Sequence, residues 1–194
     1  MRILFNELKA AQVAYRLLEL GGGRTLYIRL IKLLYLLDRA ALLKWGRPIT
    51  TDHYASMEHG PVVKDIYTLI TESPITPGQR SNPSAETLWN RYILRPSQYM
   101  VRTSEQNPGV SKLSKSEEEM ILAVHKNFGG KDRQQLIDYC HKHLPEWKNP
   151  GKGRSLEIQI SDILNGGNKT PTEIEEIESE LESFAVLQRM RSHE

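Results

Sequence analysis

The sequence predicts an α+β fold that is predominantly α-helical: a single domain with a helical core and a small antiparallel β-sheet or hairpin. Apolar residues recur at the spacing of three and four that is typical of helices through most of the chain. Helix-start signatures, each with a partner side chain three residues on, recur in the second half. Two short Tyr-containing apolar segments flank a Pro-containing turn near residue 96, which is typical of a β-hairpin.

Length and composition limit the class of protein. The 194 residues suffice for one domain with a core, and 39% hydrophobic with 26% charged residues is ordinary for a globular chain. Cys140 is the only cysteine, so no intrachain disulfide can form, which favours a reducing compartment. The most apolar stretch, residues 26–43, contains four charged residues, and the N-terminus lacks the apolar core of a signal peptide. We therefore expect a cytoplasmic protein without membrane contact.

Charge is distributed unevenly although the net charge is only +2. Residues 1–50 contain nine Lys or Arg against three acidic residues, whereas residues 171–194 contain seven Glu against two Arg. This asymmetry suits mutual docking of the two regions, a partner with a charged patch, or simply solvated helix faces.

The first half predicts two helices. Asn6 can cap a helix that ends at the glycines of 21–23. A second helix is expected at about 25–44, and because it is apolar almost all round it belongs in the middle of the domain. Gly46 and Pro48 end it.

The middle of the chain predicts the small β-structure. Residues 51–59 are interpreted as a strand, and Gly60-Pro61 is expected to open a third helix, because proline is well tolerated at a first helical position. A Pro- and Ser-rich loop follows at 73–84. Segments 92–94 and 99–101 form the predicted hairpin.

The second half predicts helices with explicit N-terminal caps. The pairs Ser114/Glu117, Asp132/Gln135 and Thr170/Glu173 each have the form of a capping box. We divide the chain into a domain at 1–168 and an acidic amphipathic helix at 169–194, either packed on the domain or used to bind a partner. Its apolar stripe consists of Ile174, Ile177, Leu181 and Phe184.

No catalytic or metal-binding pattern is present. His141 and His143 flank Lys142 next to Cys140, but residues one or two apart on a helix point in different directions and cannot converge on one ion. Cys140 lies on an apolar stripe, which is typical of a core residue. We expect no catalytic residues, no metal and no cofactor, and therefore no enzyme.

Nucleic acid is a disfavoured partner. Residues 24–47 contain six basic residues, but Leu and Ile dominate between them and the helix is expected to be buried. Such basic residues do not form a continuous stripe along which a phosphate backbone could bind.

The order of several short motifs resembles the Panacea (SocA-like) antitoxin domain family. The resemblance begins with Lys32-Leu33-Leu34-Tyr35-Leu36, Asp38-Arg39 and Gly46-Arg47-Pro48-Ile49, and continues through 54–62 and Ile66-Tyr67. It ends with Leu113-Ser114, Glu117, His141, Pro145-Glu146-Trp147 and 160–164. The motif positions that we expect to be structural are Lys32, Leu33, Tyr35, Asp38, Arg39, Gly60, Pro61, Val62, Tyr67, His141, Pro145 and Trp147.

The resemblance implies a single α-rich domain with a small antiparallel sheet, often encoded beside a toxin gene or in phage-related DNA. It implies an antitoxin that neutralises a cognate, nearby-encoded protein toxin by direct binding without catalysis. An adaptor that delivers a partner to a protease complex, and a phage-associated nucleic-acid-binding regulator, are the alternatives. The residues that we expect to contact the partner lie on the last helix: Glu173, Ile174, Ile177, Leu181 and Phe184.

Overall fold

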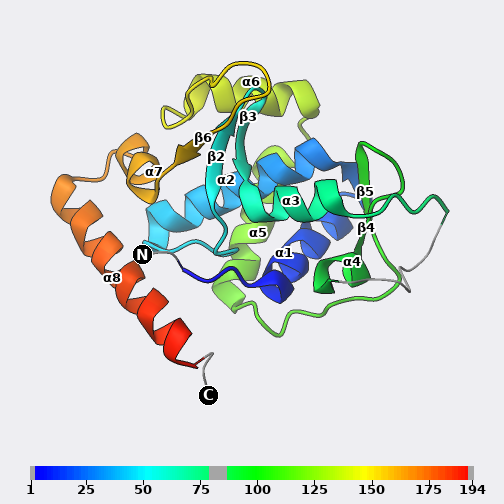
Figure 1. The fold of residues 1–194 in the computed structure, drawn as a ribbon, viewed down its shortest axis with the longest axis horizontal. Helices are drawn as coiled ribbons and strands as arrows, with labels where there is room; N and C mark the ends of the chain where they lie inside the picture. Colours follow the sequence, from blue (N-terminus) through cyan, green and yellow to red (C-terminus); the bar gives the residue numbers. More distant parts are fainter. Residues whose placement is uncertain (1–2, 79–86, 192–194) are drawn as a thin grey trace.

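The computed structural model describes residues 3–78 and 87–191, and this part of the chain has the predicted α+β, mainly helical architecture (Figure 1). The helices of the described residues are α1 (Glu7–Leu20), α2 (Tyr27–Trp45), α3 (Lys64–Glu72), α4 (Leu88–Tyr92), α5 (Lys115–Phe128), α6 (Arg133–His143), α7 (Ile160–Gly166) and α8 (Pro171–Arg191). The strands are β1 (Arg24–Leu26), β2 (Tyr54–Met57), β3 (Gly60–Val63), β4 (Ile93–Leu94), β5 (Met100–Thr103) and β6 (Leu156–Ile158).

Helix α2 lies at the centre, as its apolar sequence predicts. It packs against α1, α5, α6, α7 and strand β3, so nearly every side of it is covered. It ends at Gly46, whose φ of 69° lies in the left-handed region that glycine adopts without strain. The predicted second helix thus exists, but its first expected turn is strand β1 instead, because Arg24–Leu26 pairs with β5.

Two three-stranded antiparallel sheets flank α2, with strand orders β1-β5-β4 and β3-β2-β6. The predicted hairpin is the β4-β5 pair, in which Ile93 faces Thr103 and Leu94 faces Arg102. The predicted loop at 73–84 lies partly outside the described residues. Its described part forms no helix and only one isolated bridge, between Ile75 and Arg95.

The prediction that Gly60-Pro61 opens the third helix is wrong. Both residues belong to strand β3, which pairs with β2 and lies at the edge of its sheet. An edge strand tolerates proline, because the missing N–H leaves no ladder bond unmade. Helix α3 begins instead at Lys64, where the carboxylate of Asp52 accepts hydrogen bonds from the backbone N–H groups of Asp65 (2.7 Å) and Ile66 (2.9 Å).

The three predicted capping boxes are confirmed. Ser114 and Glu117 exchange hydrogen bonds at the start of α5, and Asp132 and Gln135 do so at the start of α6. At the start of α8 the backbone N–H of Thr170 donates to Glu173 Oε2, and that of Glu173 donates to Thr170 Oγ1. These helix starts are therefore fixed by local sequence.

Helix α8 lies along one side of the molecule, next to α7 and close to the N-terminal segment (Figure 1). In the residues that the structure describes, no helix is both long and apolar enough to cross a membrane.

Candidate partner-binding surface

The motif residues of α2 lie in the interior, and their polar atoms are bonded to other parts of the fold. Lys32 is fully buried, and its ammonium donates a hydrogen bond to the carbonyl of Pro61 (2.7 Å). A side chain at Gly60 would come within 3.1 Å of that nitrogen, so the glycine allows the close approach of β3 to α2. Burial lowers the pKa of Lys32 to about 8.

A second contact joins α2 to the segment after α6. The Tyr35 hydroxyl donates to Glu146 Oε1 (3.0 Å), and Arg39 Nε donates to the same oxygen (2.7 Å). Arg39 Nη2 also donates to the carbonyl of Gly166 (3.2 Å), the last residue of α7. The Glu146 carboxylate is fully buried, so its charge depends on these donors.

Asp38 joins the same helix to the segment that precedes β2. Its carboxylate accepts hydrogen bonds from the backbone N–H groups of Ile49 and Thr50 (both 2.9 Å), from the Thr50 hydroxyl, and from the Tyr54 hydroxyl (3.0 Å). Burial raises the pKa of Asp38 above its usual range, while these donors oppose the shift.

The remaining motif residues connect α6 and its following turn to the β2-β3 hairpin. Trp147 Nε1 donates to the carbonyl of Met57 (2.9 Å), and the His141 ring stacks on Trp147 with 3.8 Å between centroids. The other motif positions differ in exposure: Leu33 and Val62 are buried, Tyr67 is half-buried and Pro145 is exposed. Tyr67 packs edge-on against Tyr27 with 6.3 Å between ring centroids.

Cys140, His141 and His143 are the side chains near the end of α6 that could react or bind a metal, and each is buried or packed against an aromatic ring. Burial raises the pKa of the Cys140 thiol to about 11, so the thiolate needed for nucleophilic attack is scarce at neutral pH. His141 stacks on Trp147, whereas His143 lies over Tyr139, so the two histidines have different ring partners.

Asp52, His53 and Asp65 bring one potential metal-ligand atom each within 4.8 Å of one another. The Asp52 carboxylate, however, accepts hydrogen bonds from backbone N–H groups of His53, Asp65 and Ile66, and His53 Nδ1 lies 2.7 Å from Asp65 Oδ2. The cluster is thus explained as the cap that starts α3. Burial raises the pKa of Asp52 to about 7.

The predicted partner-binding stripe on α8 is partly buried and partly exposed. Ile174 and Leu181 are buried against the body, and Ile177 packs on Gly46 at the end of α2. Glu173 belongs to the helix cap, and its hydrogen bonds with Lys169 and Thr170 lower its pKa to about 2. Of the five expected contact residues, Phe184 is the apolar one that remains exposed.

Phe184 also belongs to an exposed side of α8 that the sequence prediction did not identify. We define the α8 outer face as Glu176, Glu180, Phe184, Leu187 and Met190. These residues follow one another at spacings of three and four, so they share one side of the helix. Phe184, Leu187 and Met190 are 48%, 55% and 65% exposed. The spacing that continues from Phe184 to Leu187 and Met190 is the sequence signal that could have found this face.

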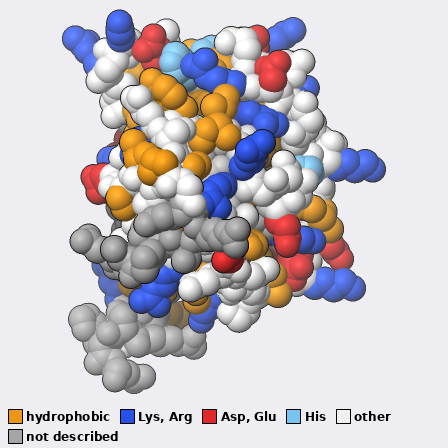
Figure 2. Space-filling view, turned by 90° about the vertical axis from the view of Figure 1, so that its right-hand side faces the viewer, with side chains coloured by type: hydrophobic (Ala, Val, Ile, Leu, Met, Phe, Trp, Pro, Cys, Tyr) orange, Lys and Arg blue, Asp and Glu red, His pale blue; other side chains and the backbone are white. Residues whose placement is uncertain are grey.

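A second exposed feature lies on the opposite side of the molecule. We define the Arg groove by Arg24, Leu26, Arg29, Met100 and Arg133, which line an open depression of about 560 Å³ between β1, β5 and the start of α6. On this side of the molecule hydrophobic side chains lie among Lys and Arg side chains (Figure 2). Arg and large apolar side chains together are typical of protein interfaces.

Comparison with models of protein families matches residues 30–148, more than half of the chain, to the family described as antitoxin SocA-like, Panacea domain. Neither curated proteins nor solved structures gave a match. The matched range contains the α2 motif residues and the segment up to Trp147, whereas α8 lies outside it.

Proposed function

Because the chain belongs to the SocA-like antitoxin family with the Panacea domain, we propose that it neutralises a cognate protein toxin by binding it directly, without catalysis. The family match is the observation that carries the proposal. The commitment of Cys140, Asp52 and Asp65 to burial or to helix capping is consistent with binding as the mode of action.

The α8 outer face is the proposed toxin contact. Three large apolar side chains in seven residues are exposed there, and exposed apolar clusters of this kind are typical of binding sites. Glu176 and Glu180 continue the same face, so the helix offers an apolar half and an acidic half. An amphipathic helix of this type fits an apolar groove with basic residues on its rim.

Co-expression with each small neighbouring open reading frame tests the proposal. We expect one neighbour to stop growth when expressed alone and to be tolerated when this chain is present. Lethal neighbours that the chain never rescues would contradict the antitoxin function.

A substitution pair tests the assigned surface. Leu187→Glu should abolish rescue, because a charge would be buried at the centre of the contact. Leu122→Glu on α5 is the matched control, since Leu122 is 45% exposed but lies on a different helix. Equal loss of rescue in both variants would remove the α8 outer face from the proposal while leaving the antitoxin function standing.

The toxin's half-life separates masking from delivery to a protease. Direct neutralisation predicts that the toxin persists in complex with the chain. A toxin that disappears faster when the chain is present would instead support the adaptor function.

A further inference from the structure

The Arg groove contains positive charge that the fold does not use. Arg29 is committed, because its guanidinium donates to the carbonyls of Lys131 and Gly129 and to Thr25 Oγ1. Arg24 and Arg133, in contrast, are exposed, and neither guanidinium makes a hydrogen bond or ion pair with a residue that the structure describes. Two open guanidinium groups therefore flank the apolar side chains of the groove.

One acid also lines the groove. Asp132 caps α6 by accepting the backbone N–H of Gln135, and its single negative charge is outnumbered by the positive charges of Arg24, Arg29 and Arg133. The groove therefore keeps a net positive charge beside an apolar floor that includes Leu26 and Met100. Its complement is a segment that carries both carboxylates and apolar side chains.

The α8 outer face has this composition within the same chain. Glu176 and Glu180 supply the carboxylates, and Phe184, Leu187 and Met190 supply the apolar side chains. From Glu176 to Met190 the face extends about 21 Å, at 1.5 Å per helical residue. Charge and polarity of the two surfaces are thus complementary.

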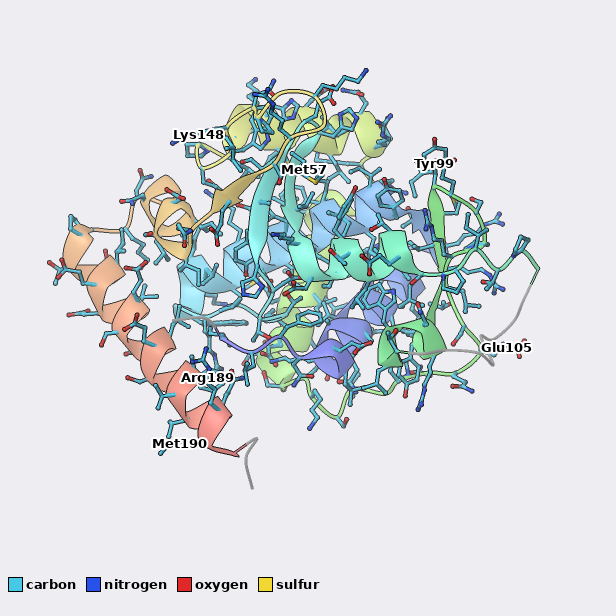
Figure 3. All side chains as sticks on the ribbon, in the orientation of Figure 1. Met57, Tyr99, Glu105, Lys148, Arg189 and Met190 are labelled. Atoms are coloured by element: carbon cyan, nitrogen blue, oxygen red, sulfur yellow. The ribbon has the colours of Figure 1, made fainter. Side chains whose placement is uncertain are left out.

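The two surfaces cannot meet within one molecule. Tyr99, which directly precedes Met100 of the groove, lies on the side opposite Arg189 and Met190 of α8 (Figure 3). Helix α8 is also fixed in place by the burial of Ile174 and Leu181. The Arg groove and the α8 outer face can therefore contact each other only between two copies of the chain.

We propose that the Arg groove binds the α8 outer face of a second copy of this chain, so that the protein associates head to tail. Such a heterologous contact uses a different surface on each copy and leaves one of each free at the ends. The assembly therefore grows with concentration instead of stopping at a two-fold dimer.

A symmetric contact between two α8 helices satisfies the charges less well. In a parallel pair, Glu176 and Glu180 would face their own counterparts, and like charges repel. In an antiparallel pair, these carboxylates would be pressed against Phe184 and Leu187, which costs desolvation without a compensating cation. The groove of a second copy supplies that cation through Arg24 and Arg133.

Nucleic acid is a poorer occupant of the groove. Binding along a phosphate backbone needs a continuous row of open cations, whereas here Arg29 is already committed and Asp132 contributes a negative charge.

The α8 outer face is also the proposed toxin contact, so the toxin and a second copy would compete for it. Self-association is measured on the purified full chain without toxin, and its failure would leave the proposed antitoxin function standing. We expect the weight-average mass to rise above the 22.3 kDa of one chain as the concentration increases at about 20 mM salt. It should fall back toward that mass at about 500 mM salt, where the ionic contacts are screened. A mass of one chain at every concentration and at low salt would overturn the proposal.

Mixing two complementary variants identifies the surfaces. The groove variant carries Arg24→Glu with Arg133→Glu, and the face variant carries Leu187→Glu with Met190→Glu. Each alone should be a monomer, with association weakened about tenfold or more, because each lacks one half of the contact. Mixed together they should form a complex of two chains and stop there, since one intact groove meets one intact face.

The same experiment has two results that would contradict the head-to-tail contact. If the groove variant alone still associates as the unmodified chain does, the contact is α8 with α8 and the proposal fails. If the two monomeric variants do not combine, the groove and the face are not partners. Circular dichroism and thermal melting of both variants confirm that the chain is folded, because all four substituted side chains are exposed.

Discussion

Helices α2 and α8 bear charged and apolar residues in opposite arrangements. Helix α2 carries Lys32, Asp38 and Arg39 into the interior, and each meets a partner from elsewhere in the fold. Helix α8 keeps its glutamates outside and also leaves Phe184 and Leu187 in contact with solvent. Charges that are buried must be matched by the fold itself. Apolar side chains that are left outside remain available to another molecule. The family-motif residues thus stabilise the body, and α8 is the helix that we propose for recognition.

The largest effect is expected from Glu146→Gln, which removes the buried charge that Arg39 and Tyr35 share. Breaking a buried ion pair on one side leaves the other charge unmatched, so unfolding free energy should fall by roughly 3–5 kcal/mol. Urea unfolding measures it, with Glu119→Gln on the exposed face of α5 as the matched control. A loss as small as the control's would mean that the α2 contacts are not what stabilises the body.

Comparison with Lys32→Met tests how the buried Lys32 of α2 makes the stability of the protein depend on pH. Burial lowers the pKa of Lys32 from 10.5 to about 8, so between these values the unfolded chain holds the proton that the folded chain has released. The unmodified protein should therefore gain stability relative to Lys32→Met as pH rises through this window, by about 3 kcal/mol in all. Urea unfolding of both proteins at several pH values measures this difference, which also includes the change that removal of the Lys32 ammonium causes in the pKa of Cys140. If the difference in unfolding free energy between the two proteins stayed constant from about pH 8 to 10.5, the lowered pKa of the buried Lys32 ammonium would be contradicted.

Deletion of residues 170–194 tests whether α8 belongs to the body or only docks on it. The loss of Ile174 and Leu181 from the interior is partly offset by the entropy of a helix that no longer needs ordering. We expect the shortened chain to unfold cooperatively with a net loss of about 2 kcal/mol, and to lose toxin neutralisation entirely. Collapse of the whole fold would instead place α8 within the core that the motif residues build.

Thr170→Ala gives the smallest effect. The substitution removes the hydroxyl that accepts the backbone N–H of Glu173 and so breaks the capping box at the start of α8. It should cost about 1 kcal/mol, seen as a lower melting temperature. Thr172→Ala, on the exposed first turn of the same helix, is the matched control, and an equal loss in both variants would contradict the role of the cap.

Local pattern was enough for the parts of the fold that local interactions fix. The helical spacing of α2, the three capping boxes and the β4-β5 hairpin follow from neighbours within a few residues. Strands β1 and β6, with three residues each, form only because β5 and β2 lie beside them, which no local pattern reveals. The same limit explains the error at Pro61, whose tolerance in β3 depends on an open sheet edge.

The candidate site shows the same division. Spacing identified α8 as amphipathic, and its burial against the body could not be predicted, because Ile177 is covered by Gly46 from a distant helix end. The spacing from Phe184 to Met190 groups these residues on one side of the helix, but their exposure depends on how Ile174 and Leu181 pack against the body.

The most direct test measures toxin binding and thermal stability together for Leu187→Glu, with Leu122→Glu as the control. We predict that the free energy of unfolding of Leu187→Glu lies within about 0.5 kcal/mol of that of the unmodified chain, as is usual for exposed substitutions. The variant should nevertheless no longer bind the toxin identified by co-expression. Leu122→Glu should keep both properties. A Leu187→Glu variant that binds as tightly as the unmodified chain would contradict the assignment of recognition to α8.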